Sequence, residues 1–331
     1  MSELTLLGLD DARWSEFVTG RKDALPFHLP AWAHLLAECY GFRPFVAALL
    51  RNGAVESGLP VLAVRRRRWV ALPFTDVCPP LGPAGPLAAA LDTARGRATL
   101  EVRSALPGAS GVPAAWQHVL ALDRDPERAR EGFHRSQVQR NIRRAEREGV
   151  LVRTATVETD LTETFYALHV RTRRRLGAPV QRRRFFSLLW RHLLAEGHGC
   201  ALIAEHEGVP AAGAVFLTAG TTVVYKYGAS DERLWGARPN HAIFWHAIRA
   251  ACADGRERLD FGRTDFADTG LREFKLGWGA AEEQLVYSSL GGRLHAPPLH
   301  ASGGSSAARR VLQTSPPWVC RAAGLLYGYA A

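Results

Sequence analysis

The chain has 331 residues, 47% of them hydrophobic and 22% charged, a balance typical of a globular protein long enough for two domains. No apolar run is long enough to span a membrane, and the N-terminus lacks the basic start and apolar run of a secretory signal, so we expect a cytoplasmic protein. Five widely spaced cysteines without a CxxC pair argue against a disulfide framework and a zinc site, and we expect no metal.

The formal net charge is +10 and the isoelectric point is near 9.9. Such a surplus favours an anionic partner, either nucleic acid or a phosphorylated substrate. The basic residues are almost all arginine, and a genome-wide codon bias would give the same preference. The charge is therefore informative only where it clusters.

The first half of the chain predicts a mixture of helices and strands. Residues 30–41 place apolar side chains at helical spacing and end at a glycine. Residues 42–74 read as strands, with Asn52-Gly53 as a two-residue hairpin turn. The other elements expected here are a helix at 11–20, a short helix within 79–96, and strands at 98–104 and 115–123.

A long helix is predicted from Pro126 to Glu148, ending at Gly149. It carries a basic cluster. This cluster is either a solvated helix face or an anion-binding edge, and the sequence favours the two interpretations about equally. The residues of this cluster are Arg140, Arg143, Arg144 and Arg147.

The second half predicts two helices, a three-strand meander, a helix, a strand, a short helix and a strand. This is the order of a GNAT-type acyltransferase half. The expected ranges are 157–177, 182–197, 200–208, 209–220, 221–230, 239–254, 258–262, 270–277 and 282–290. A low-complexity linker and a short apolar helix follow, and this helix either packs on the first domain, which we favour, or lies on a membrane surface.

Five sequence motifs resemble the FemABX peptidyltransferases and, more closely, the GNAT-like FemAB-related proteins. The resemblance runs from about Gln137 to Leu290 and is weaker before that. The combination of FGR-(S/T) with FK-x-x-WG is specific, although each piece alone is weak. The motifs are RNIRRAEREGV (140–150), TRRRLG (172–177), YKYGAS (225–230), RPNHAIFWHAIRAA (238–251) and LDFGRTDFADTGLREFKLGWGA (259–280).

The resemblance implies an α/β (α+β) fold of tandem GNAT-like domains, with mixed sheets flanked by helices. We expect an N-terminal domain over 1–149, joined by a C-terminal helix at 306–331, and a C-terminal domain over 150–295. The implied reaction forms a peptide bond by moving an aminoacyl group from aminoacyl-tRNA to an amine, without a cofactor. The acceptor is a peptidoglycan precursor of the cell wall, which can be phosphorylated or nucleotide-linked, or a small amine of antibiotic biosynthesis. The chain has no room for the coiled-coil arm of glycine-adding members, which leaves the acceptor open.

Lys275, one of three lysines in the chain, resembles the lysine of the family's FK motif. Attack of an amine on an ester carbonyl creates an oxyanion, and a fixed cation aimed at it lowers the barrier by about 3 kcal/mol. Lysine presents a compact point charge, whereas arginine presents a broad fork. The alternative is a surface lysine near the end of a short helix, and the motif favours the catalytic interpretation.

Arg263 follows the strand at 258–262 and is expected to project into the cleft, where it would bind phosphate or carboxylate, or else to pair with a nearby acid. Candidates for taking the proton of the amine are Asp265, Asp268 and Glu273, and more weakly Asp76 of the first domain.

The remaining binding candidates come from the other motifs. Tyr225 and Tyr227 alternate on a strand and are expected to point to one face, lining the cleft or filling the core. Arg175 resembles the arginine of the T-x-x-R-x-G motif, which contacts acceptor phosphate in the family, and Arg171 shares its helix face; a basic helix surface is the alternative. Two further residues of the motifs are placed at the substrate site, Trp278 packing beneath it and Asn240 binding.

Two other functional classes stay open. An acyl-CoA N-acyltransferase, with acetyl-CoA as co-substrate, needs a pyrophosphate loop of the form R/Q-x-x-G-x-G/A. The chain offers Arg233-x-x-Gly236, but Arg238 stands where a small residue belongs and Pro239 removes an N–H donor. A non-enzymatic binding protein for nucleic acid or polysaccharide precursors would also suit the arginine clusters.

Overall fold

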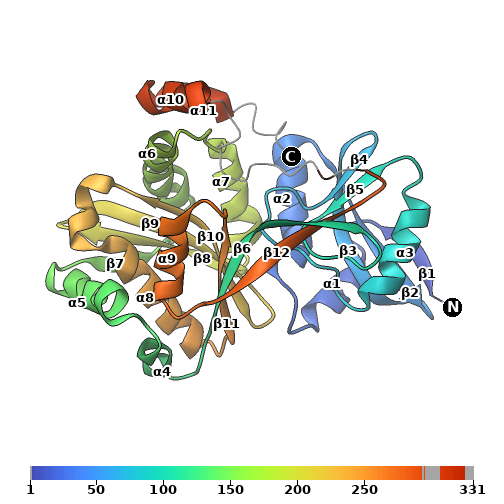
Figure 1. Cartoon of the computed structure of the whole chain (residues 1–331), viewed down its shortest axis with the longest axis horizontal. Helices are drawn as coiled ribbons and strands as arrows, with labels where there is room; N and C mark the ends of the chain where they lie inside the picture. The colour runs from blue at the N-terminus through green and yellow to red at the C-terminus, as the bar shows by residue number, and fades with distance from the viewer. Residues whose placement is uncertain (1, 293, 295–305, 325–331) are drawn as a thin grey trace.

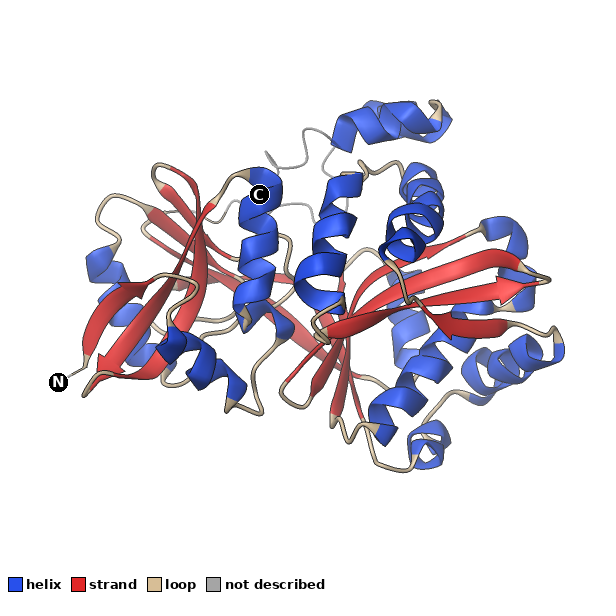
Figure 2. Ribbon diagram, turned by 180° about the vertical axis from the view of Figure 1, so that it is seen from behind, coloured by secondary structure: helices blue, strands red, loops and turns tan. Residues whose placement is uncertain are grey.

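The computed structural model describes residues 2–292, 294 and 306–324, and within them twelve strands form one mixed sheet with helices on both faces (Figures 1 and 2). The strands are β1 (Glu3–Leu7), β2 (Arg43–Arg51), β3 (Ala54–Arg65), β4 (Arg68–Ala71), β5 (Thr99–Val102), β6 (Ser110–Ala121), β7 (Leu151–Thr154), β8 (Gly199–His206), β9 (Val209–Ala219), β10 (Thr222–Ser230), β11 (Arg258–Thr264) and β12 (Ala281–Leu290). The α-helices are α1 (Ala12–Thr19), α2 (Pro30–Tyr40), α3 (Ala84–Ala94), α4 (Pro126–Glu131), α5 (Arg140–Arg147), α6 (Tyr166–Leu176), α7 (Arg183–Leu189), α8 (Pro239–Ala253), α9 (Thr269–Gly277), α10 (Ser306–Thr314) and α11 (Pro317–Ala323). The 3-10 and π-helical turns are η1 (Pro26–His28), η2 (Arg135–Gln139), η3 (Asp160–Phe165), η4 (Trp190–Leu194) and η5 (Glu232–Ala237).

Most predicted elements are present. The hairpin turn between β2 and β3 is confirmed, because Asn52 and Gly53 both have positive φ, at 52° and 81°. The meander of β8, β9 and β10 is also confirmed. The sequence missed the two edge strands, β1, which pairs with β2, and β7, which pairs with β8.

The single long helix predicted from Pro126 to Glu148 is wrong. The chain leaves helical geometry after α4, and the backbone N–H of His134 donates to the carbonyl of Gly277 at 2.8 Å instead of to its own helix. Phe133 is inserted between Trp245 and Trp278, with ring centroids 6.0 and 5.1 Å away. Burial of this aromatic side chain offsets the loss of helical hydrogen bonds, and helix resumes in η2 and α5.

The two halves share strands. The sheet order is β1-β2-β3-β4-β5-β12-β6-β11-β10-β9-β8-β7. Thus β12 of the second half lies between β5 and β6 of the first, and β6 lies between β12 and β11. The sheet is therefore continuous across the predicted boundary at residues 149 and 150.

The C-terminal helices differ from the expectation that they return to the first half. Both α10 and α11 pack against α6 of the second half, and Arg174 of α6 donates to the carbonyl of Ser315 at 2.7 Å (Figure 1). Residues 295–305 and 325–331, which the predicted linker and C-terminal helix include, lie outside the described residues.

In the second half, helices cover both faces of the sheet. One apolar cluster joins α8 and α5 to β8, β9 and β11. A larger cluster on the other face joins α6 and α7 to α2 of the first half. The core therefore runs from one half into the other. In the described part of the chain, no helix combines the length and apolar character needed to cross a bilayer.

The strands β10 and β11 are parallel neighbours that separate along their length. Their register covers only Thr222–Val224 against Arg258–Asp260. Beyond this point β10 continues with β9, whereas β11 continues with β6. The sheet therefore opens toward the carboxyl ends of both strands, the position where ligands bind in open α/β sheets.

Candidate active site

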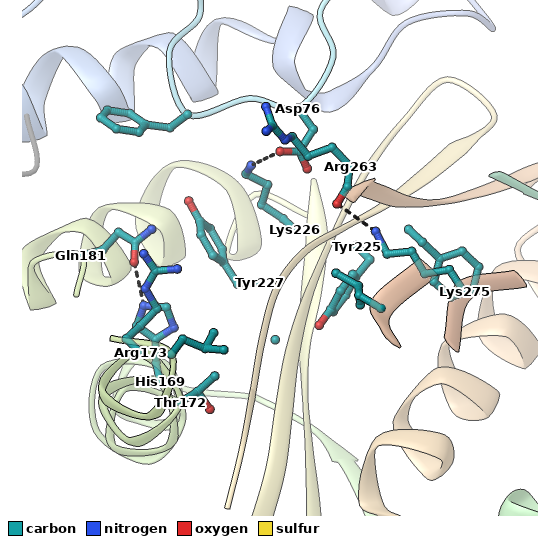
Figure 3. Close-up of a pocket in the computed structure, with 15 residues that line it drawn as sticks. Asp76, His169, Thr172, Arg173, Gln181, Tyr225, Lys226, Tyr227, Arg263 and Lys275 are labelled. Atoms are coloured by element: carbon teal, nitrogen blue, oxygen red, sulfur yellow. Dashed lines mark hydrogen bonds and ion pairs between the residues drawn. The ribbon is translucent and has the colours of Figure 1, made fainter. Parts of the chain in front are cut away.

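A cavity of about 200 Å³ lies where β10 and β11 separate (Figure 3). Its walls come from the loop after β4, from α6, and from β10, β11 and α9, so both halves contribute. Since a water molecule occupies about 30 Å³ in the liquid, the space is suited to a group of about amino-acid size.

Lys275 of α9 lines this cavity and is only 2% exposed. Its Nζ donates to the carbonyls of Gly262 at 2.8 Å and Arg263 at 3.0 Å. An ammonium has three N–H donors, so one is left for a substrate. Burial lowers the pKa of Lys275 to about 8, opposed by the negative charges of Asp76 and Asp260, and the group is mostly protonated at neutral pH.

Asp76 also lines the cavity, so the weakest of the sequence candidates is the carboxylate that the fold brings to Lys275. Its loop is held tightly: the Thr75 hydroxyl donates to the Leu72 carbonyl at 2.6 Å, and the Tyr287 hydroxyl donates to the Asp76 carbonyl at 2.6 Å. Leu72 and Phe74 have φ of 55° and 64°, a region that costs about 1–2 kcal/mol for non-glycine residues. Such strain persists only where surrounding contacts enforce it.

Lys226 is a cavity residue that the sequence did not identify. Its Nζ lies 3.8 Å from Asp76 Oδ1 and 5.4 to 5.7 Å from the ring centroids of Phe27, Trp32 and Tyr227. Burial lowers the pKa of Lys226, and the charge of Asp76 opposes this effect. The available signal was the scarcity of lysine in the chain, because two of the three lysines line one cavity.

Asp260, at the end of the paired part of β11, was also missed. It is 2% exposed and accepts from the Gly262 backbone N–H at 2.7 Å and from Gln117 Nε2 at 2.6 Å. Burial raises the pKa of Asp260 to about 6. Gly262 has φ of +71°, and a Cβ there would lie 2.6 Å from Asp76 Oδ2, so the close approach of β11 to Asp76 requires glycine.

Arg263 lines the cavity and is 9% exposed. Its guanidinium forms an ion pair with Asp265 and lies beside Asp76 (Figure 3). Arg263 therefore faces the cleft and is also paired with an acid. Its binding of phosphate or carboxylate stays a prediction.

Two candidate proton acceptors lie elsewhere. Glu273 is on the exposed side of α9, because positions two apart in a helix do not share a face and Lys275 points inward. The Asp268 side chain caps the same helix by accepting from the backbone N–H of Leu271 at 3.0 Å. Asp265 is occupied by Arg263.

Tyr225 and Tyr227 do not share a face, contrary to the expectation from strand alternation. A β-bulge places Lys226 as an extra residue, since Tyr225 pairs with Phe216 while Tyr227 pairs with Val215. Figure 3 accordingly shows Tyr225 on the side of Lys275 and Tyr227 on the opposite side of β10.

Arg171 and Arg175 do not line the cavity. Arg171 forms an ion pair with Asp231, and Arg175 lies 3.5 Å from Glu232 and over the ring of Trp235. These ion pairs attach α6 to the segment at Asp231 and Glu232. The spacing of residues in the sequence did not reveal these acidic partners.

Trp278 and Asn240 also lie outside the cavity. Trp278 is fully buried in the cluster beneath α8, with its ring centroid 5.6 Å from that of Phe244. Asn240 is half-buried in the first turn of α8.

The basic cluster on α5 stays largely free of acidic partners. Arg144 lies 3.4 Å from Glu148, whereas Arg140, Arg143 and Arg147 are exposed and make no ion pair with the described residues. Across the ranges that the structure describes, no group of three His, Cys, Asp or Glu side chains is arranged to hold a metal ion.

Comparison with known proteins supports the GNAT-like fold. The family described as "Acetyltransferase (GNAT) domain" matches residues 132–276. The chain is 36% identical over 86 residues to the lipid II:glycine glycyltransferase of Staphylococcus aureus. The crystal structure of FemX superposes with a TM-score of 0.69 at 16% identity, over 86% of this chain and 96% of FemX. Residues 132–276 therefore match a GNAT domain, and the fold of the chain is similar to that of FemX.

The match of residues 132–276 to an acetyltransferase (GNAT) domain supports an acyltransferase. A tandem GNAT protein from the clavulanic acid biosynthesis pathway also superposes, with a TM-score of 0.51 at 13% identity, over 89% of this chain and all of that one. The match to the glycyltransferase covers 24% of this chain and 20% of that protein.

Proposed function

We propose that this GNAT protein is an aminoacyltransferase that moves an aminoacyl group from aminoacyl-tRNA to an amine, forming an amide. The observation that carries the proposal is the buried Lys275 ammonium in a cavity of amino-acid size, facing the carboxylate of Asp76. Lys275 can stabilise negative charge on the carbonyl oxygen, and Asp76 can take a proton from the attacking nitrogen.

The reaction follows from these two groups. The amine nitrogen attacks the ester carbonyl of the donor, a C–N bond forms, and Lys275 donates its third N–H to the developing oxyanion. Asp76 accepts a proton from the attacking nitrogen. The intermediate then collapses as the ester C–O bond breaks. The ribose oxygen of the tRNA leaves with the proton that Asp76 had accepted, and Asp76 returns to its carboxylate form.

Lys226 and Arg263 keep Asp76 in place for this role. Both cations lie beside its carboxylate and hold its position in the cavity. Gly262 allows β11 to approach the same carboxylate closely.

The tRNA donor is supported by the exposed arginines of α5, which suit contacts to phosphates. A charged tRNA donor implies that the reaction takes place in the cytoplasm. If this surface binds tRNA, replacing the three unpaired arginines by glutamine lowers the affinity. It also makes the affinity less dependent on salt. The slope of log K against log salt concentration decreases in magnitude by about 0.7–0.9 for each phosphate that is no longer neutralised. A filter-binding titration at several salt concentrations measures both quantities. The replaced residues are Arg140, Arg143 and Arg147.

The acceptor is proposed from the relative that the chain resembles. That protein is a lipid II:glycine glycyltransferase, which supports an amine of a peptidoglycan precursor as the acceptor. The tandem GNAT protein of the clavulanic acid pathway supports a small acceptor of antibiotic biosynthesis as the second choice.

An acyl-CoA donor is the alternative, favoured by the GNAT acetyltransferase family match. The loop before α8, where a pyrophosphate would bind at the helix N-terminus, argues against it. Arg238 has φ of 62°, Pro239 lacks an N–H, and the N–H groups of His241 and Ala242 both donate to the carbonyl of Arg238.

The test supplies the protein with each radiolabelled aminoacyl-tRNA, a set of amines including a peptidoglycan precursor, and acetyl-CoA in parallel. The proposal expects amide product from at least one aminoacyl-tRNA and none from acetyl-CoA. Acetyl transfer without aminoacyl transfer would establish the alternative, and absence of both products would remove the enzyme hypothesis.

A further inference from the structure

The wall of the cavity on the α6 side carries an arginine that lies within the TRRRLG motif (172–177) but was not a candidate from the sequence. Arg173 lines the cavity and is 9% exposed. Its Nε donates to the carbonyl of Pro179 at 2.9 Å, which fixes the plane of the guanidinium. It lies between Arg171 and Arg175 in sequence, yet these two face η5 while Arg173 faces the cavity.

No carboxylate neutralises this guanidinium. Arg173 makes no ion pair with any residue that the structure describes, and the carboxylate among the described lining residues, Asp76, lies beside Lys226 on the far side of Tyr227 (Figure 3). A largely buried charge without a partner is costly. An anionic ligand would remove that cost.

A second donor lies beside Arg173. Gln181 is 6% exposed, lines the cavity, and accepts a hydrogen bond on Oε1 from His169 Nε2 at 2.7 Å. His169 is neutral, because burial and the positive charge of Arg173 lower its pKa to about 3. This bond turns the amide nitrogen of Gln181 away from His169, and that nitrogen has no partner in the described part of the chain.

We propose that Arg173 and Gln181 bind a carboxylate of the acceptor, so that the substrate is an amino acid or short peptide whose amine points past the β10 bulge toward Lys275. A planar guanidinium fork matches a planar carboxylate, and one positive charge balances one negative charge. The cavity, at about 200 Å³, suits a substrate of this size. The inference rests on the proposed function only in naming this ligand as the acceptor.

The test is a binding titration without any tRNA, so that failure of the aminoacyl transfer reaction and failure of this site are distinguishable. The probes are glycylglycine and glycylglycinamide, which differ only in the carboxylate. The wild-type protein is expected to bind glycylglycine about 10- to 100-fold more tightly, the usual effect of hydrogen bonds between charged groups. Equal binding of the two probes, or no binding of either, would overturn the proposal.

Three variants locate the effect. Arg173→Gln should abolish the preference for glycylglycine, and Gln181→Glu should reverse it in favour of the amide while keeping the oxygen that His169 requires. Arg184→Gln is the matched control, since that arginine is 60% exposed on α7. A preference that survives in the first two variants, with native circular dichroism, contradicts the site. If Arg173→Gln does not fold, the Gln181→Glu result decides alone.

Discussion

Replacing Lys275 by methionine separates catalysis from stability. Methionine has a similar length but no charge and no donor, so the developing oxyanion loses its N–H partner. Loss of one oxyanion donor lowers kcat by about 10²–10³, or about 3–4 kcal/mol in the barrier. The substrate KM should change little, because the interaction is made in the transition state.

The same substitution should leave the fold at least as stable. Burial lowers the pKa of Lys275 from 10.5 to about 8, which corresponds to about 3 kcal/mol against folding at neutral pH. The unfolded chain binds the proton of Lys275 more tightly than the folded chain does. The free-energy penalty on folding therefore has its full size below pH 8 and disappears as the pH rises to 10.5. Methionine removes it and loses two hydrogen bonds, to Gly262 and Arg263, worth about 1 kcal/mol each. We therefore expect Lys275→Met to be about 0–2 kcal/mol more stable at pH 7.

The assay pairs single-turnover transfer from aminoacyl-tRNA with urea unfolding. The ratio of wild-type to variant rate should fall as the pH rises above 8, because wild-type Lys275 then loses its proton. A rate loss below tenfold in a folded variant would refute the oxyanion role. A loss of several kcal/mol in stability would show that Lys275 holds β11 in place rather than acting on substrate.

The other predictions concern residues around Lys275. Asp76→Asn should lower kcat by about 10²–10⁴ and should also lower the unfolding midpoint, because the buried ammonium of Lys226 loses the carboxylate beside it. Glu273→Gln, on the exposed side of α9, should change neither quantity, and equal effects of the two substitutions on transfer kinetics would exclude Asp76 as the proton acceptor. Gly262→Ala should cost about 1–2 kcal/mol in urea unfolding and lower activity, because it strains a φ of +71° and pushes on Asp76; wild-type behaviour would contradict the close approach. Burial raises the pKa of the Asp260 carboxyl to about 6. The unfolded chain releases this proton at lower pH than the folded chain, so the carboxyl lowers the free energy of unfolding increasingly as the pH rises from about 4 to 6. Asp260→Asn should therefore gain stability relative to wild type over that range, and a parallel pH profile in unfolding experiments would show that the group is not buried as described.

Local sequence determined most of the secondary structure. The Asn52-Gly53 turn formed as expected because its two residues tolerate positive φ, and the order of helices and strands in the second half indicated the GNAT fold. The FGR and FK motifs brought Lys275 and Arg263 into consideration because such spacing is specific to a family. These features depend on neighbours along the chain, which a sequence displays directly.

The tertiary structure alone decided which charged groups meet. Asp76 reaches Lys226 because the loop after β4 crosses to β10, about 150 residues later, and Tyr227 changes face because one extra residue enters a bulge. Arg173 faces the cavity, whereas Arg171 and Arg175 on the same helix pair with Asp231 and Glu232. The rotation of α6 about its axis, set by its packing on the sheet, decides which of these side chains faces the cavity. Contacts between distant segments depend on packing of the whole core, so side chains of one type along the same helix acquire different partners and different chemistry.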